Sequence, residues 1–208
     1  MNLISNCCAG AYIYRDYLKV QYPNPFIWSS IAKYEDLYNL IKNYKNINFN
    51  NVEMIKFCDY VPITCWTEFN KQYKYLTGLR VDNTFNVFWV HNYYDPNCKT
   101  PKICGGEVYY YRNYEYTLNN WNKRIKRMNL NEKPIFLVLT QRNHGSTFEN
   151  SLQLLKDFPD ENIIMITSFK DLLQYNTKTH HVYFTPCVDR SPEWILKEMY
   201  NQIDFNFT

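Results

Sequence analysis

The chain has 208 residues, of which 46% are hydrophobic and 21% are charged, and its formal net charge is +3. This length and composition are typical of one globular domain with a substantial core. So mild a charge gives no electrostatic case for a nucleic-acid partner, and no stretch approaches the roughly 18 to 20 consecutive apolar residues of a membrane span. We therefore expect neither nucleic acid as a partner nor a membrane span.

Cysteine usage predicts free thiols in a reducing compartment. The seven cysteines are an odd number and form no repeated C-x-x-C pair, which disfavours a disulfide framework and a zinc ribbon. The first residues lack a basic segment followed by an apolar one, so nothing there predicts secretion. We expect a cytoplasmic protein, in a bacterium or in a virus-infected host cell, with no metal site. The sequence leaves its oligomeric state open.

Hydrophobic periodicity predicts a strand, a tight loop and a helix at the start of the chain. The apolar run 2–5 fits a buried strand, and apolar residues recur at helical spacing over 9–18. Two prolines in 22–25 should break that helix, because proline disfavours helix in the residue before it. A second helix, 35–43, has acidic residues in its first turn, and the polar run 46–51 is typical of a connector.

The middle of the chain is rich in predicted strands. We place them at 54–57, 63–69, 73–79 and 85–91. The last of these is aromatic and β-branched, so it should be central in its sheet. A loop rich in proline and glycine follows over 95–106, and a helix over 116–128 comes next.

Strands and helices alternate in the last third of the chain. We predict strands at 135–140, 163–167 and 182–184, and helices at 148–156, 170–173 and 192–200. Ser146, three residues before Glu149, is predicted to cap the first of these helices. The alternation favours a layered α/β fold, a mixed β-sheet with helices packed on it. We expect a single domain over 1–208, with a β-rich subdomain around 52–112.

The first candidate site is the loop between the first strand and the first helix, which begins with Ser5 and Asn6. A thiol at Cys8 would lie near the positive end of the helix dipole, which lowers its pKa and raises its thiolate fraction. Exposed amides there could stabilise an oxyanion or bind a phosphate. The alternative is that Cys7 and Cys8 are small buried packing residues, the commoner state of free cysteine.

The second candidate site is the polar loop before the helix at 148. His144 could act as a general base or acid, and the amides after it could hold a carboxylate or a phosphate. The simpler interpretation is a polar loop that ends in an N-cap serine, and the two are compatible. Ligands gather at the carboxyl ends of parallel strands, so this loop and Cys8 could face one crevice. Candidate binding residues of the loop are Arg142, Asn143, Gly145, Ser146 and Thr147.

Two further features could take part in chemistry. His91 closes the strand 85–91, either as a base aimed into a cleft or as a satisfied core residue. The helix 116–128 has a basic face on which Arg124 and Arg127 stand one turn apart. This pair could hold an anionic substrate, although such faces are usually only solvated.

Several common motifs are absent. The sequence has no phosphate-binding glycine loop, no zinc-protease or hydrolase motif and no D-x-D signature of metal-dependent glycosyltransferases. His180 and His181 with Cys187 match no standard metal spacing.

Several short motifs occur in the order found in one protein family. They are I-S-N-C-C-A-G at 4–10 followed by Tyr14 and Asp16, Y-P-N-P-F at 22–26, H-N-Y at 91–93, Trp121 with Arg124, Arg127 and Asn129, and N-H-G-S-T at 143–147. In this order, from Ile4 to about Pro186, the chain resembles a family of unknown function commonly labelled exopolysaccharide or capsule biosynthesis proteins. The resemblance implies an α/β fold with mixed sheets and a role in surface-polysaccharide assembly. It implies no established reaction.

The chain departs from the family pattern in both candidate loops. The first loop of the family has the pattern S-N-N-C-W-G-G, so Cys8 matches the family cysteine while Cys7 replaces an asparagine and 9–10 replace W-G. The later family loop has the pattern D-G-C-T, so His144 replaces an acid and Ser146 replaces a cysteine. If that acid is essential in the family, the activity of this chain would be altered or lost.

Surface-polysaccharide assembly needs glycosyl, acyl and phosphoryl transfers, which leaves three hypotheses. The first is a transferase or hydrolase acting on a glycan or its activated precursor, with Cys8 as nucleophile and His91 or His144 as base. The second is a glycosyltransferase that binds a nucleotide-sugar and does not use the thiol. The third is a non-catalytic glycan-binding protein.

The basic helix would supply binding residues in the first hypothesis. Arg124 and Arg127 would orient an anionic donor, a nucleotide-sugar or acyl-coenzyme A, and Asn129 belongs to the same predicted binding set. The expected partner is a glycan or a sugar precursor, and no cofactor is assigned beyond such a donor.

Overall fold

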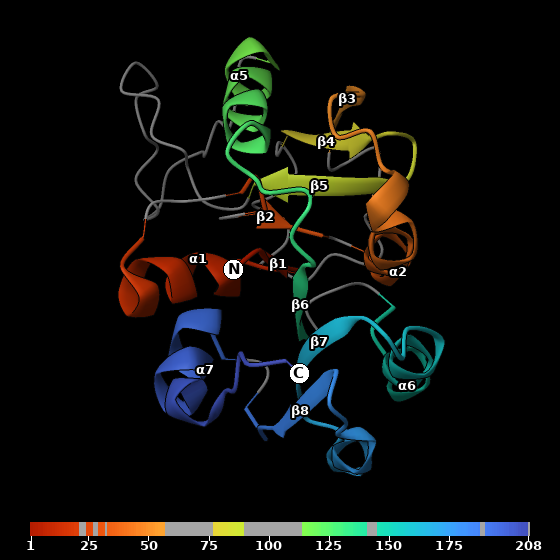
Figure 1. Cartoon of the computed structure of the whole chain (residues 1–208), viewed down its shortest axis with the longest axis vertical. Helices are drawn as coiled ribbons and strands as arrows, with labels where there is room; N and C mark the ends of the chain where they lie inside the picture. Colours follow the sequence, from red (N-terminus) through yellow and green to blue (C-terminus); the bar gives the residue numbers. More distant parts are fainter. Residues whose placement is uncertain are drawn as a thin grey trace, which may run out of the picture.

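The computed structural model of the chain contains two four-stranded sheets (Figure 1). The parallel sheet has the order β1 (Leu3–Ser5), β6 (Ile135–Leu139), β7 (Asn162–Thr167) and β8 (His180–Phe184). The structure describes residues 1–20, 24–26, 29–31, 33–56, 77–89, 114–140, 145–187 and 190–207.

The second sheet is antiparallel. Its order is β2 (Ser29–Ser30), β5 (Phe85–Trp89), β4 (Thr77–Val81) and β3 (Val52–Lys56). The strand predicted to be central, β5, lies between β2 and β4, which confirms that prediction. The layered α/β fold is also confirmed, and its parallel and antiparallel pairs lie in separate sheets. Within the predicted β-rich region 52–112, the described residues form β3, β4 and β5. Residues 57–76 and 90–113, which include the predicted strand 63–69, lie outside the described residues.

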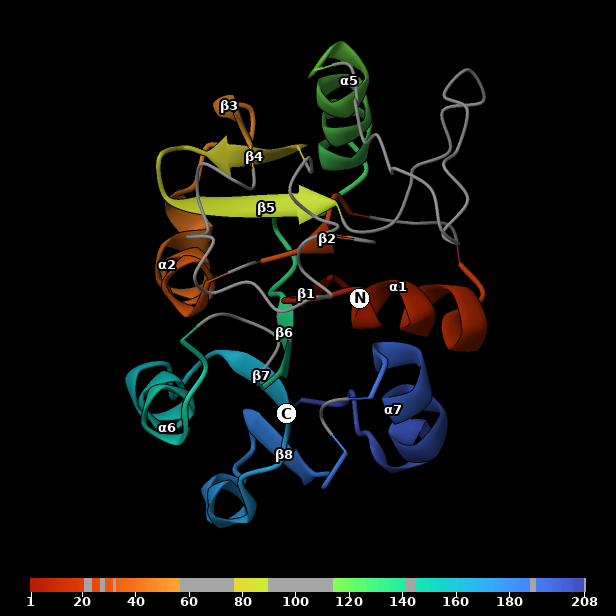
Figure 2. The same ribbon diagram turned by 180° about the vertical axis from the view of Figure 1, so that it is seen from behind.

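Helices cover both faces of the parallel sheet (Figures 1 and 2). One face is covered by α1 (Ala9–Tyr12), its π-helical continuation η1 (Ile13–Leu18) and α7 (Pro192–Met199). The other face is covered by α2 (Tyr34–Asn43), α6 (Phe148–Asp157) and the short helix η4 (Lys170–Tyr175). In β6, Phe136 and Val138 pack on the α6 side, whereas Leu137 and Leu139 pack on the α1 side. This alternation explains why the strand I-F-L-V-L is apolar at every position.

An aromatic cluster joins the two sheets. Phe26 lies against Phe49, Phe85 and Trp121, with ring centroids 5.9 to 6.3 Å apart. The indole of Trp121 donates a 2.7 Å hydrogen bond to the carbonyl of Phe49. The prediction that 46–51 is a polar connector was therefore incomplete, because Phe49 is a core residue.

Most predicted helix boundaries are within two residues of the observed ones, and α5 and the cap of α6 show the differences that matter for the candidate site. α5 spans Tyr114–Ile125 instead of 116–128, and the residues after it form turns. The N-cap of α6 is Thr147, whose hydroxyl accepts from the amide of Asn150 at 3.2 Å, so the cap predicted at Ser146 was wrong. The described residues also include the short helices η2 (Tyr44–Asn46) and η5 (Tyr200–Gln202). Within the described segments, every helix is too short or too polar to reach across a bilayer.

Side chains occupy the outer edge of β1, the first strand of the parallel sheet. The hydroxyl of Tyr14 accepts from the amide of Leu3 at 2.9 Å and donates to the carbonyl of Met1 at 3.0 Å. The amide group of Asn24 donates to the carbonyl of Leu3 at 2.7 Å. Both side chains are buried, so the backbone groups of this edge are satisfied inside the protein.

His180 is a buried histidine at the start of β8. Its side chain has 3% exposure, and its Nε2 lies 2.9 Å from the carbonyl oxygen of Phe158. Burial lowers the pKa of His180 below its usual 6.5, and the neighbouring His181 lowers it further. The hydrogen bond to Phe158 opposes these effects without reversing them.

We expect the protein to lose stability as the pH falls below about 6.5 because of His180. Above that pH the His180 imidazole is neutral in both the folded and the unfolded chain. Below it, the imidazole becomes protonated in the unfolded chain before it does in the folded chain, so protonation favours unfolding. Urea unfolding between pH 7.5 and 5.5 should show a smaller loss in His180→Gln, whose amide can still donate to Phe158. His181→Gln is the comparison variant and should reduce the loss less than His180→Gln does, because burial, the largest cause of the lowered His180 pKa, remains. An unchanged slope in His180→Gln would contradict the assignment.

Candidate functional site

The carboxyl ends of β1 and β6 form the place in this fold where a ligand is expected. The strands are parallel neighbours, so their following loops emerge at one edge of the sheet. The chain after β1 enters α1 on one face, whereas the chain after β6 enters α6 on the other. Such a divergence is a topological switch point, and ligands of open α/β sheets bind in the crevice outside it.

The side chain of Asn6 joins the two strand ends. Its Nδ2 donates to the carbonyl of Leu139 at 2.9 Å, and its Oδ1 accepts from the amide of Leu139 at 3.0 Å. The backbone amide of Asn6 donates to Leu137 at 3.2 Å, which continues the ladder of β1 and β6. The side chain is fully buried, so Asn6 joins the two strand ends inside the protein and is not itself exposed to a ligand. Ser5 is also buried, and its hydroxyl accepts from the amide of Cys7 at 3.4 Å.

The two cysteines follow at the start of α1. Cys8 is the N-cap residue, its side chain makes no capping hydrogen bond, and its exposure is 8%. Cys7 packs with the apolar residues between the sheet and α7. Cys8 is thus at the predicted start of the helix that follows β1, but little of it reaches the surface.

Tyr12 lies one helical turn after Cys8. Burial, together with the negative charges of a Cys8 thiolate and of Glu193, raises the pKa of Tyr12 to about 12. The phenol therefore stays protonated near neutral pH and cannot take a proton from the thiol. The guanidinium of Arg15 lies 4.9 Å from the ring centroid of Tyr12 and 3.9 Å from the carboxylate of Glu193. These contacts tie α1 and its continuation to α7.

The predicted bases for Cys8 lie outside the described residues. His91 and His144 both fall in segments that the structure leaves undescribed. The described histidines, His180 and His181, begin β8 and so belong to the amino edge of the sheet, opposite the crevice. Within the described ranges, no group of three His, Cys, Asp or Glu side chains is placed to hold a metal ion.

The second predicted loop is described from Gly145 onward, and Arg142 and Asn143 lie outside the described residues. Gly145 is exposed with φ of 83°, a backbone conformation that favours glycine. The side chain of Asn150 donates to the carbonyl of Gly145, and the hydroxyl of Tyr34 donates to the carbonyl of Asn150 at 2.6 Å. Together with the Thr147 cap, these bonds fix the first turn of α6 at the edge of the crevice.

The predicted basic pair is divided between two environments. Arg124 is buried near the end of α5, whereas Arg127 is exposed and lies beyond that helix. Asn129 is exposed and accepts from the amide of Asn131 at 3.2 Å. α5 lies beyond the antiparallel sheet in both views (Figures 1 and 2), so a joint role of these residues at the crevice stays a prediction.

Sequence reasoning missed a row of hydroxyl residues along the carboxyl edge. Thr140, Thr167 and Thr185 each end or follow a strand, and all three are buried. The hydroxyls of Thr140 and Thr167 are 3.2 Å apart and hydrogen-bonded. The hydroxyl of Thr167 also accepts from the amide of Phe169 at 3.0 Å. The signal in the sequence is that four apolar runs, ending L-I-S, V-L-T, M-I-T and Y-F-T, all close on a hydroxyl residue.

Asn6→Ala should destabilise the protein by about 2 to 4 kcal/mol, because the buried amide and carbonyl of Leu139 would both lose a partner. Asn131→Ala, at an exposed position, is the control and should change stability by less than about 0.5 kcal/mol. The free energy of unfolding in urea measures both. Equal stability of Asn6→Ala and wild type would show that the strand ends do not depend on this side chain.

Comparison of the chain with models of known protein families finds no match, and comparison with curated proteins finds none either.

Proposed function

We propose that the protein is a transferase that acts on a glycan or its activated precursor, with the donor bound in the crevice between β1 and β6. The observation that carries this proposal is the pair of hydrogen bonds between Asn6 and Leu139, which holds the carboxyl ends of two parallel strands together. A cytoplasmic location, where activated sugar precursors are made, belongs to the same proposal.

The loop before α6 supports a donor that carries phosphate groups. Gly145 is exposed and has no side chain to hinder approach, and Ser146 follows it at an intermediate depth. The Thr147 hydroxyl accepts from Asn150 and still has its own proton to donate. The ten-residue helix behind these groups adds its positive dipole end. A nucleotide-sugar pyrophosphate matches this set of donors.

The burial of Cys8 favours glycosyl transfer over a covalent acyl-enzyme. A nucleophilic thiol must reach the carbonyl of its substrate, and the Cys8 side chain is 8% exposed. Its place beside the crevice keeps acyl transfer as the second candidate. In that reaction the Cys8 thiolate would attack an acyl-coenzyme A thioester, form a new thioester and release the coenzyme A thiolate.

A nucleotide-sugar should stabilise the folded protein. At about 100 times its dissociation constant, the ligand adds about 2.7 kcal/mol, which corresponds to a rise in Tm of roughly 5 to 10 °C. The measurement is a thermal-shift screen against UDP-, GDP- and CMP-sugars, acyl-coenzyme A compounds and free sugars. Ser146→Glu should abolish the rise, because a carboxylate at the start of α6 repels the pyrophosphate.

Gln202→Glu is the control for Ser146→Glu. It makes the same change of charge at an exposed position near the end of the helix that follows β8, toward the opposite edge of the sheet. This variant should keep the rise in Tm. Stabilisation by free sugars alone would favour a glycan-binding protein, and no stabilisation by any compound would overturn the proposal.

Incubation with acetyl-coenzyme A should leave the mass of the intact protein unchanged, because Cys8 is buried. Intact-mass spectrometry at neutral pH, with Cys8→Ala and Cys7→Ala beside the wild type, makes the measurement. An added acetyl group that disappears in Cys8→Ala and persists in Cys7→Ala would instead establish Cys8 as a nucleophile and favour acyl transfer.

A further inference from the structure

The end of α5 and the turn after it carry a cluster of exposed cations. Residues 117–133 contain five basic side chains and one acidic side chain. Lys123, Lys126 and Arg127 are exposed, and no described carboxylate forms an ion pair with any of the three. Nothing on the described part of this surface neutralises their charge.

An exposed leucine lies next to these cations. Leu130 is 48% exposed, and the turn that carries it is fixed by its neighbours. Met128 is buried, and its amide donates to the carbonyls of Arg124 and Ile125, both at 3.1 Å. The amide of Glu132 donates to the carbonyl of Asn129 at 3.1 Å. Leu130 is therefore held at the surface by an anchored turn.

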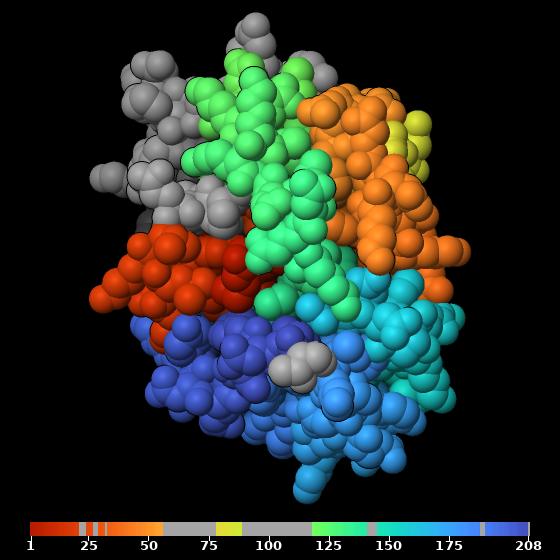
Figure 3. Space-filling view, in the orientation of Figure 1, coloured from red at the N-terminus to blue at the C-terminus, as the bar shows by residue number. Residues whose placement is uncertain are grey.

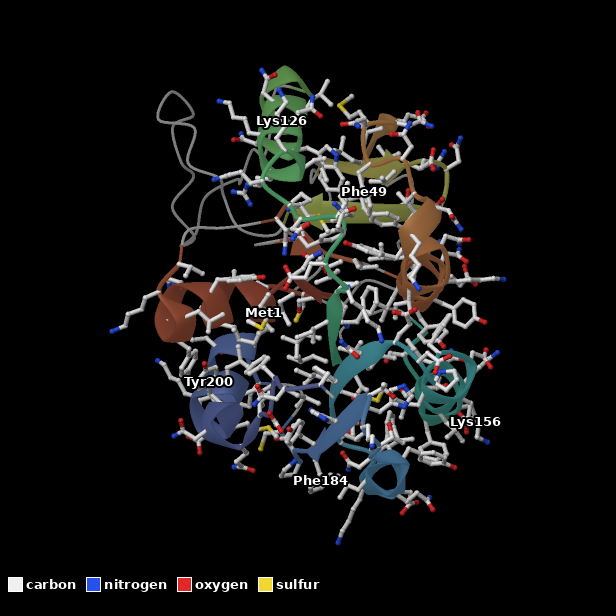
Figure 4. The ribbon with its side chains drawn as sticks, viewed as in Figure 1. Met1, Phe49, Lys126, Lys156, Phe184 and Tyr200 are labelled. Atoms are coloured by element: carbon white, nitrogen blue, oxygen red, sulfur yellow. The ribbon has the colours of Figure 1, made fainter. Side chains whose placement is uncertain are left out.

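The position of the segment leaves it accessible. Figure 3 shows α5 and the residues after it, in green, at the surface of this face. Figure 4 labels Lys126, the residue directly after α5, toward one end of the long axis, whereas Lys156 lies on α6 in the other half. We refer to Lys123, Lys126, Arg127 and Leu130 as the basic patch.

We propose that the basic patch binds the surface of an anionic lipid membrane. The three cations would contact lipid headgroups, and Leu130 would enter the boundary between headgroups and acyl chains. Charge complementarity alone would also fit a soluble polyanion. The exposed leucine among the cations favours the membrane, because a polyanion offers no apolar layer to receive it.

The expected affinity is weak and reversible. Each basic residue near an anionic surface strengthens binding roughly fivefold, and partial burial of one leucine adds about five- to tenfold. Together they give an association constant on the order of 10³ M⁻¹, which millimolar lipid reveals. Such binding would bring the proposed transferase to a membrane-bound acceptor, but it does not depend on that function and is measured without turnover.

The test is co-sedimentation with vesicles of phosphatidylcholine containing about 30% phosphatidylserine, at about 0.1 M salt. The wild type should bind these vesicles, and binding should disappear at about 0.5 M salt and with pure phosphatidylcholine. The triple variant K123Q/K126Q/R127Q should bind on the order of 100-fold more weakly, and L130S about five- to tenfold more weakly. All these side chains are exposed, so the variants should keep the wild-type Tm.

The matched control is K156Q/K170Q/K178Q, which removes the same charge from exposed positions outside the patch. It should bind within about twofold of the wild type, since headgroup attraction acts only within a Debye length. If the two triple variants lose vesicle binding equally, the proposal is wrong, and the net charge of the whole protein accounts for binding. Wild-type binding by L130S together with tight binding to dextran sulfate would overturn it in favour of a polyanion, and no vesicle binding would overturn it outright.

Discussion

The junction between the carboxyl ends of β1 and β6 depends on one side-chain amide. β1 is only three residues long, and the Asn6 side chain adds two hydrogen bonds where its own ladder with β6 ends. An asparagine can do this because its amide offers a donor and an acceptor at the spacing of a backbone peptide. The bonds hold the start of α1 and the end of β6 together although the two segments lie more than 130 residues apart in the sequence.

Most of the fold follows from hydrophobic patterning. Runs such as 135–139 and 163–167 are apolar at every position, which predicts strands buried on both faces, and the helices between them imply parallel pairing. The division into two sheets could not be predicted, because β-propensity says nothing about which strands become neighbours. The N-cap of α6 is Thr147 and not the predicted Ser146, for a local reason. Both residues can cap, and the register of the helix decides between them.

The candidate site could be predicted only in part. The carboxyl ends of parallel strands meet at one edge, so Asn6, Cys8, Arg142 and His144 were expected to face one crevice, and Arg142 and His144 lie outside the described residues. The burial of Cys7 depends on how α7 packs beside α1, and that contact joins segments about 180 residues apart. Arg124 and Arg127 differ in burial although only three residues separate them. Arg124 lies within α5 and is buried, whereas Arg127 lies after the end of α5 and is exposed.

The edge of β1 has a consequence for how the protein behaves at high concentration. An open edge strand offers unpaired amides and carbonyls to a strand of another molecule and so promotes aggregation. Here the phenol of Tyr14 and the amide of Asn24 already occupy the backbone of Leu3 on that side. The parallel sheet is thereby closed to growth through its first strand, and the residues that close it come from the helix and loop that directly follow that strand.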